Sequence, residues 1–264
     1  MPRIAVGLEY DGAGFAGWQT QAQAPSVQAA VEAALSTVAD AAVSVIIAGR
    51  TDAGVHSAGQ VAHFDTSAIR SARGWVLGAN AQLPDAVSVR WAQVVPRHFH
   101  ARYSAESRTY RYFILNRLGR SALRAGRVAL VYKPLDVEAM AQAASLLPGE
   151  HDFSAFRAAG CQARSPVRRL YSLAVWREGE HVVIEARANA FLHHMVRNLV
   201  GLLIAVGQGK ARPQWALTVL ESRDRTLAAP TAPAEGLYFW QVHYPRAFGL
   251  PESISAIMTP PPSA

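Results

Sequence analysis

The residue best placed to do chemistry is Asp52, which lies in the run Gly49-Arg50-Thr51-Asp52-Ala53-Gly54-Val55-His56. The run follows an apolar stretch typical of a β-strand, so the carboxylate is expected on a turn at the strand's end. A carboxylate is a modest nucleophile and a good leaving group, which suits covalent catalysis. Asp-Ala-Gly is equally common in turns, where Asp accepts backbone hydrogen bonds and Gly takes a positive φ. The residue types alone leave both interpretations open.

Arg197 is the second candidate, because it interrupts an apolar segment. The helical stripe of that segment consists of Leu192, Val196, Leu199, Leu203 and Val206. No acidic residue lies between Glu185 and Glu221, so we expect a carboxylate from elsewhere in the fold to balance this charge. A guanidinium beside a carboxylate would also keep that carboxylate ionised. The alternative is that Arg197 reaches solvent or a surface phosphate.

Metal and nucleotide patterns are weak. His193 and His194 are adjacent and would face different directions on a helix, while His98 and His100 lack an acidic or cysteine companion at ligand spacing. The glycines of residues 12–17 are not followed by the lysine of a phosphate-binding loop. We therefore expect no metal site and no nucleotide cofactor.

The composition describes an ordered, basic protein. Half of the residues are apolar, the net charge is +7, and Lys133 and Lys210 are the only lysines among the 26 basic residues. A positive excess favours a polyanionic partner, although GC-rich coding also enriches arginine. Cys161 is the only cysteine, which predicts a reducing compartment. With no signal peptide and no apolar run long enough to cross a bilayer, we expect a soluble cytoplasmic protein.

The elements alternate in an order typical of ferredoxin-like α+β folds. In the first half, strands are predicted at Arg3–Glu9, Val43–Ile47, Gln60–Phe64 and Val87–Val94, and helices at Ser26–Val38 and Ser71–Asn80. In the second half, strands are predicted at Arg108–Leu115, Arg169–Trp176, His181–Ala188 and Leu237–Val242, and helices at Val137–Leu147, Phe191–Val206 and Pro213–Glu221. Basic connections span residues 117–133 and 157–169.

These patterns predict two halves and a tail. Residues 1–103 would form an N-terminal ferredoxin-like (RRM-like) half carrying the Asp52 turn, and residues 104–245 a second half that completes the active-site cleft. Both halves would have mainly antiparallel sheets, joined side by side, with helices packed on them. Residues 246–264 form a Pro-rich tail that we expect to be mobile.

Several stretches together resemble one known family. They are Gly49 to His56; Tyr10-Asp11-Gly12 with Phe15 and Gly17-Trp18-Gln19; Phe99 to Ala105; Arg108 to Tyr112; Ser154 to Arg157 with Cys161 and Ser165 to Arg168; Phe191 to Asn198; and Pro233 to Leu237. In this order they resemble the tRNA pseudouridine synthase A (TruA) family, and they cover residues 4 to about 242. An eight-residue match around Asp52 is far more specific than a turn.

The resemblance implies a cofactor-free isomerase that converts uridine to pseudouridine at positions 38, 39 and 40 of the tRNA anticodon stem-loop. It implies that Asp52 is the catalytic residue, that Arg197 pairs with it, and that Tyr110 packs against the target uracil. The implied substrate contacts are Arg50, Tyr110, His56, Arg157 and Arg168. It also implies a homodimer that grips the tRNA, with no membrane partner.

Two other functions fit part of the sequence. A non-catalytic RNA-binding protein would explain charge and fold but not a carboxylate in a loop that meets a polyanion, because a carboxylate repels phosphate. A nucleoside hydrolase would use a similar Asp and release free uracil. The products of an incubation with tRNA distinguish all three.

Overall fold

The computed structural model describes residues 1–251, and in them it contains ten strands and five α-helices. The protein is mixed α/β, and its strands pair mostly antiparallel. The described residues divide into two compact units: unit 1 comprises residues 1–106 and 238–251, and unit 2 comprises Ser107–Leu237. No helix in the described part of the chain is long and apolar enough to cross a membrane.

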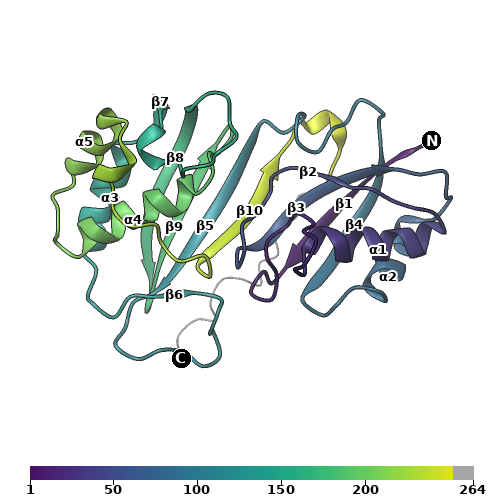
Figure 1. The fold of residues 1–264 in the computed structure, drawn as a ribbon, viewed down its shortest axis with the longest axis horizontal. Helices are drawn as coiled ribbons and strands as arrows, with labels where there is room; N and C mark the ends of the chain where they lie inside the picture. The colour runs from purple at the N-terminus through teal and green to yellow at the C-terminus, as the bar shows by residue number, and fades with distance from the viewer. Residues whose placement is uncertain (252–264) are drawn as a thin grey trace. The chain divides into compact units, whose positions relative to one another are not determined.

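Unit 1 is a sheet with helices on one face (Figure 1). Its elements are β1 (Arg3–Tyr10), α1 (Val27–Ala39), β2 (Ile46–Ile47), β3 (His56–Asp65), α2 (Ala72–Asn80), β4 (Val87–Val95), β10 (Leu237–His243) and the 3₁₀ turn η3 (Arg246–Phe248). The strand order is β4-β1-β3-β10, β2 also pairs with β3, and only β10 runs parallel to its neighbour β3. From Tyr238 on, the last strand belongs to unit 1.

Alternation along β1 explains the two faces of this sheet. Val6 and Leu8 pack with the buried apolar residues of α1 and α2. Ala5 points to the other face of the sheet, where it packs in a second cluster with Val61 and Phe99. Phe248 of η3 packs against that second cluster. Of the tail, residues 252–264, including the Pro-rich end, lie outside the described residues.

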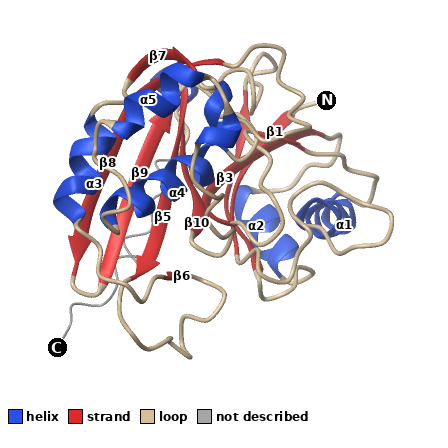
Figure 2. Cartoon of the chain, turned by 60° about the vertical axis from the view of Figure 1, so that its left-hand side comes forward, coloured by secondary structure: helices blue, strands red, loops and turns tan. Residues whose placement is uncertain are grey.

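In unit 2, helices cover one face of the strands (Figure 2). All its strands belong to the same ten-stranded sheet as those of unit 1. Its elements are β5 (Ser107–Leu115), β6 (Ala129–Leu130), α3 (Val137–Ser145), β7 (Gly149–Asp152), η1 (Ser154–Phe156), β8 (Val167–Glu178), β9 (His181–Ala188), α4 (Met195–Gly207), α5 (Trp215–Ser222) and η2 (Arg225–Leu227). The order is β5-β9-β8-β7, all antiparallel, and β6 pairs parallel with β5.

The helices of unit 1 are confirmed where cap and stripe agree. Ser26 Oγ accepts a hydrogen bond from Ala29 N–H, and Ser71 Oγ accepts one from Gly74 N–H, as expected of N-caps.

The strand predicted at Val43–Ile47 is wrong before Ile46. There, Val43 and Val45 donate their N–H groups to side chains of α1 at 2.9 Å, so they are not available to a strand ladder.

The helix predicted from Phe191 begins only at Met195. His194 adopts the left-handed region (φ 60°), and Met195 N–H closes a turn on Leu192 O, so the motif enters α4 through a bend. The apolar stripe did not reveal this bend because it continues through Leu192. The strand predicted from Gln60 starts four residues earlier, at His56, where small and polar side chains hide the alternation.

Candidate functional site

The Asp52 loop, residues 49–55, is held by backbone hydrogen bonds to residues 11–18. Thr51 O accepts from Trp18 N–H at 3.0 Å, and Phe15 O accepts from Gly54 N–H at 3.4 Å. Within the loop, Val55 N–H donates to Asp52 O at 3.1 Å and closes a turn. Asp52 is half-buried, while its neighbour Thr51 is buried. The carboxylate therefore lies on a turn whose backbone is fixed on both sides.

Two glycines allow this close approach. A Cβ on Gly12 would lie 2.0 Å from Val55 O, and one on Gly17 would lie 2.8 Å from Thr51 O. Gly17 also adopts φ 101°, which side chains rarely tolerate. Gly12 and Gly17 thus allow the backbones of the two loops to lie in direct contact.

Replacing Gly12 with Ala is expected to destabilise unit 1, because backbone cannot move away as a flexible side chain can. We expect a loss of about 2–3 kcal/mol, in the range of overpacking substitutions. Urea unfolding followed by tryptophan fluorescence measures it. Gly14→Ala is the matched control, since no atom lies within 4 Å of its added Cβ. Equal stability of both variants would contradict the close packing of the two loops.

Arg50 and His56 lie near Asp52 in the chain and differ in their burial. Arg50 is exposed. His56 is buried: its Nδ1 lies 3.0 Å from Gly12 N and 3.1 Å from Asp11 Oδ1, and its ring stacks on Tyr238 with centroids 4.6 Å apart. This placement makes His56 a support of the loop, and its contact with substrate stays a prediction.

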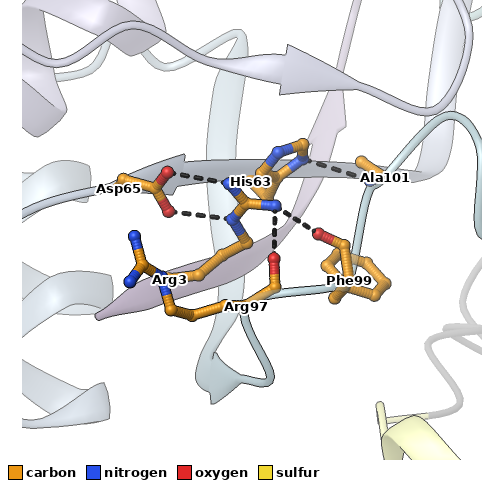
Figure 3. Close-up of polar contacts among 6 residues, drawn as sticks. All are labelled: Arg3, His63, Asp65, Arg97, Phe99 and Ala101. Carbon is orange, nitrogen blue, oxygen red and sulfur yellow. Dashed lines mark hydrogen bonds and ion pairs between the residues drawn. The ribbon is translucent and has the colours of Figure 1, made fainter. Parts of the chain in front are cut away.

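The segment 97–101, which precedes β5, is tied to β1 by Arg3 and to β3 by His63 (Figure 3). Arg3 forms a two-pronged ion pair with Asp65 at 2.8 Å and donates to the carbonyls of Arg97 and Phe99. His63 Nδ1 accepts from Ala101 N–H at 3.1 Å. The sequence analysis missed Arg3 and His63, because neither belongs to a recognisable motif.

His63 makes the stability of unit 1 depend on pH. Burial, reinforced by the charge of Arg3 and by His100, lowers the pKa of His63 from 6.5 to about 4. The native ring therefore stays neutral where the unfolded ring takes up a proton. Its stabilising contribution is complete above pH 6.5, is lost as pH falls toward 4, and changes no further below it.

The expected loss between those limits is at most about 3 kcal/mol, from about 1.4 kcal/mol for each unit of pKa difference. Urea unfolding of the wild type between pH 7 and pH 4 measures the loss. His63→Asn keeps an acceptor for Ala101 N–H but does not titrate, so its stability should fall less over the same range. Parallel curves for the two proteins would contradict this role of His63.

In unit 2, Tyr110 lies on β5 and is half-buried. Its ring meets Phe191 edge-on, with centroids 4.9 Å apart and an interplanar angle of 80°. Tyr112, two residues on, is fully buried and donates its hydroxyl to Pro233 O at 2.9 Å. Burial raises the pKa of Tyr112 well above its ordinary value. Tyr112 is therefore a core residue, as its strand position predicted, whereas Tyr110 is partly accessible.

Arg197 lies in the first turn of α4 and is oriented by the segment 230–232. Its Nε donates to Ala232 O at 2.7 Å, and its own carbonyl accepts from Ala232 N–H at 3.1 Å. One turn further along α4, a Cβ on Gly201 would lie 2.0 Å from Pro230 O. The segment thus lies directly on the helix backbone and fixes one edge of the guanidinium.

Asn198, which the sequence analysis did not single out, holds the same region together. It is fully buried, donates to Phe156 O at 2.7 Å, and accepts from Thr231 Oγ1 at 2.6 Å and Arg225 Nη2 at 3.1 Å. The available signal was a polar residue inside an apolar helix, since a buried amide needs partners.

Arg157 and Arg168 brace the loop between them. Arg157 donates to the carbonyls of Cys161 and Ala163, and Arg168 to those of Ser165 and Val167. Burial lowers the pKa of Arg168, and the charge of Arg157 adds to this effect. Two positive charges that act on each other in this way favour an anion nearby. Of the expected site residues, Asp52, Arg50 and His56 thus belong to unit 1, and Tyr110, Arg157, Arg168 and Arg197 to unit 2.

Comparison with known proteins identifies one family. The family model described as tRNA pseudouridine synthase matches residues 8–104 and 143–245. The chain is 58% identical to the tRNA pseudouridine synthase A of Methylococcus capsulatus over 248 residues, which cover 94% of this chain and 92% of that protein. It is 55% identical to that of Vibrio cholerae serotype O1 over 250 residues (95% of each chain), and 54% identical to that of Thiobacillus denitrificans over 253 residues (96% and 97%).

Proposed function

The chain belongs to the tRNA pseudouridine synthase A family, whose members are isomerases, and on that premise we propose that Asp52 is its nucleophile. The proposed substrate is uridine at positions 38, 39 and 40 in the anticodon stem-loop of tRNA. The observation that carries the proposal is the fixed turn of the Asp52 loop within a match that covers nearly the whole chain.

The proposed architecture is two ferredoxin-like halves with the active-site cleft between them. Unit 1 supports the first half, since its elements β1, α1, β2, β3, α2 and β4 follow the order of that fold. Its strand order β4-β1-β3, with β2 beside β3, is also that of an antiparallel ferredoxin-like sheet.

The reaction moves one bond within one nucleotide. The bond between N1 of uracil and C1′ of ribose breaks, the uracil rotates, C5 bonds to C1′, the proton on C5 leaves, and N1 takes up a proton. Asp52 either captures C6 of the base or removes a proton from the ribose, and both routes end with the carboxylate regenerated. Atoms and electrons balance without an oxidant, a reductant or net hydrolysis, so the proposed reaction needs no cofactor.

The other expected residues have supporting roles in this proposal. Arg197 keeps the Asp52 carboxylate ionised, and the half-buried ring of Tyr110 packs against the uracil, with its phenol available to help remove the C5 proton. The exposed Arg50 contacts the everted nucleotide, which leaves its stack at a cost of a few kcal/mol. Arg157 and Arg168 bind phosphates, which read position more than sequence. We also propose a homodimer as the tRNA-binding form.

The experiment is an incubation of purified protein with an unmodified tRNA transcript in the absence of any cofactor. The RNA is then treated with a carbodiimide that tags pseudouridine, and tagged sites are mapped by reverse transcription. Tagging at positions 38 to 40 is the expected result. Free uracil in the supernatant would identify a hydrolase, and bound but unchanged tRNA would identify an RNA-binding protein without this activity.

A further inference from the structure

Tyr10, the last residue of β1, connects the sheet to the Asp52 loop. Its side chain is 4% exposed, and its phenol oxygen lies 2.8 Å from Thr51 Oγ1. Thr51 is the residue directly before Asp52, and its carbonyl oxygen is already fixed by Trp18 N–H. Both the side chain and the backbone of Thr51 are therefore held by hydrogen bonds.

The phenol belongs to a buried polar group, the tyrosine cluster, formed by Tyr10, Thr51, Ser57 and Gln60. All four side chains are buried, and the phenol forms its hydrogen bond with Thr51 Oγ1. Gln60 in turn donates its Nε2 to Gly49 O at 2.7 Å. The cluster thus fixes the loop at Gly49 and at Thr51, both of which precede Asp52 in the chain.

The chemistry of Tyr10 points to placement and not to proton transfer. Burial raises the pKa of Tyr10 to about 12, although hydrogen bonds with Thr51, Gln60 and Ser57 oppose this shift. The phenol therefore stays protonated at neutral pH, and a group that does not titrate there is a poor general base. Its function is to donate and accept hydrogen bonds in a fixed geometry.

We propose that Tyr10 is a positioning residue for the isomerisation. It fixes Thr51 and thereby the direction in which the Asp52 side chain points from the loop. This inference rests on the proposed function, in which Asp52 is the nucleophile. One peptide bond separates the two residues, so a rotation of Thr51 moves the carboxylate directly. A misplacement of about 1 Å can reduce the rate by about 10²-fold.

The test compares kcat and KM for tRNA in Tyr10→Phe, Thr51→Val and the double variant. Each single variant removes one hydroxyl and keeps the shape of the side chain. We expect kcat to fall by about 10- to 100-fold in each, with KM within two-fold of the wild type. The double variant should lose no more than either single variant, because both act through one hydrogen bond. Thr51→Ser keeps the hydroxyl and should restore kcat.

Tyr244→Phe is the matched control for stability. It also removes a tyrosine hydroxyl in unit 1. That hydroxyl donates a hydrogen bond of 2.6 Å to Ala101 O, which is not part of the Asp52 loop. We expect it to lower Tm by an amount similar to Tyr10→Phe while kcat stays at the wild-type value. A fall in kcat of equal size in both variants would show that lost stability, and not placement, explains the result.

Other outcomes are equally decisive. A kcat within two-fold of the wild type in Tyr10→Phe, or losses that add in the double variant, would overturn the inference. If Tyr10→Phe does not fold, the contrast between Thr51→Val and Thr51→Ser carries the same test. Asp52→Asn is measured in parallel: an inactive Asp52→Asn beside a fully active Tyr10→Phe contradicts the role of Tyr10 alone, whereas an active Asp52→Asn contradicts the proposed function.

Discussion

Asp52→Asn is expected to yield a folded protein that binds tRNA within a few-fold of the wild type and forms no measurable pseudouridine. The fold should survive because the turn is closed by the carbonyl of Asp52, which Asn retains, and not by its carboxylate alone. Activity should fall by about 10³-fold or more, because an amide has neither the charge nor the basicity of the proposed nucleophile.

Three measurements on Asp52→Asn separate the interpretations: circular dichroism for the fold, filter binding for tRNA affinity, and the pseudouridine assay for turnover. Asp85→Asn, which removes the same charge at an exposed position, is the control and should remain fully active. Combined loss of fold and binding would make Asp52 a structural turn residue. Retained turnover would place the nucleophile elsewhere.

Arg197→Met is expected to reduce kcat by about 10²-fold. Met has a similar length but no charge, so the proposed partner of Asp52 is lost while α4 is preserved. The negative charge that the proposed mechanism places on Asp52 then lacks its stabilising cation. Initial rates at saturating tRNA measure the loss in kcat.

Arg197→Lys separates charge from geometry. Lysine keeps the positive charge but has no Nε–H to donate to Ala232 O, the hydrogen bond that orients the guanidinium. We expect a smaller loss in kcat than in Arg197→Met. If Arg197→Met keeps kcat within two-fold of the wild type, the proposed pairing with Asp52 is refuted. If it raises KM for tRNA and leaves kcat unchanged, Arg197 acts through tRNA binding.

The helices show where local signals suffice. Ser26 and Ser71 cap helices whose apolar stripes repeat at helical spacing, so cap and stripe predict the same element. Where a side chain from another element takes a backbone N–H, as Glu32 does at Val45, no local pattern records it. The same holds for β7, whose four residues Gly149–Asp152 carry no apolar alternation and pair only because β8 lies alongside.

The sequence by itself determined the family, the candidate residues and most of the elements, because motif spacing and side-chain periodicity are local properties of the chain. Only the tertiary structure decided how the Asp52 loop is held: by the backbone of residues 11–18, where Gly12 leaves room, and by Tyr10 through Thr51. It also joined Arg3 and His63 to segment 97–101 by hydrogen bonds, and Arg197 to Ala232 in the same way. These contacts join residues that are between 33 (Trp18 and Thr51) and 96 (Arg3 and Phe99) positions apart. The geometry of a hydrogen bond between distant segments exists only once both are packed.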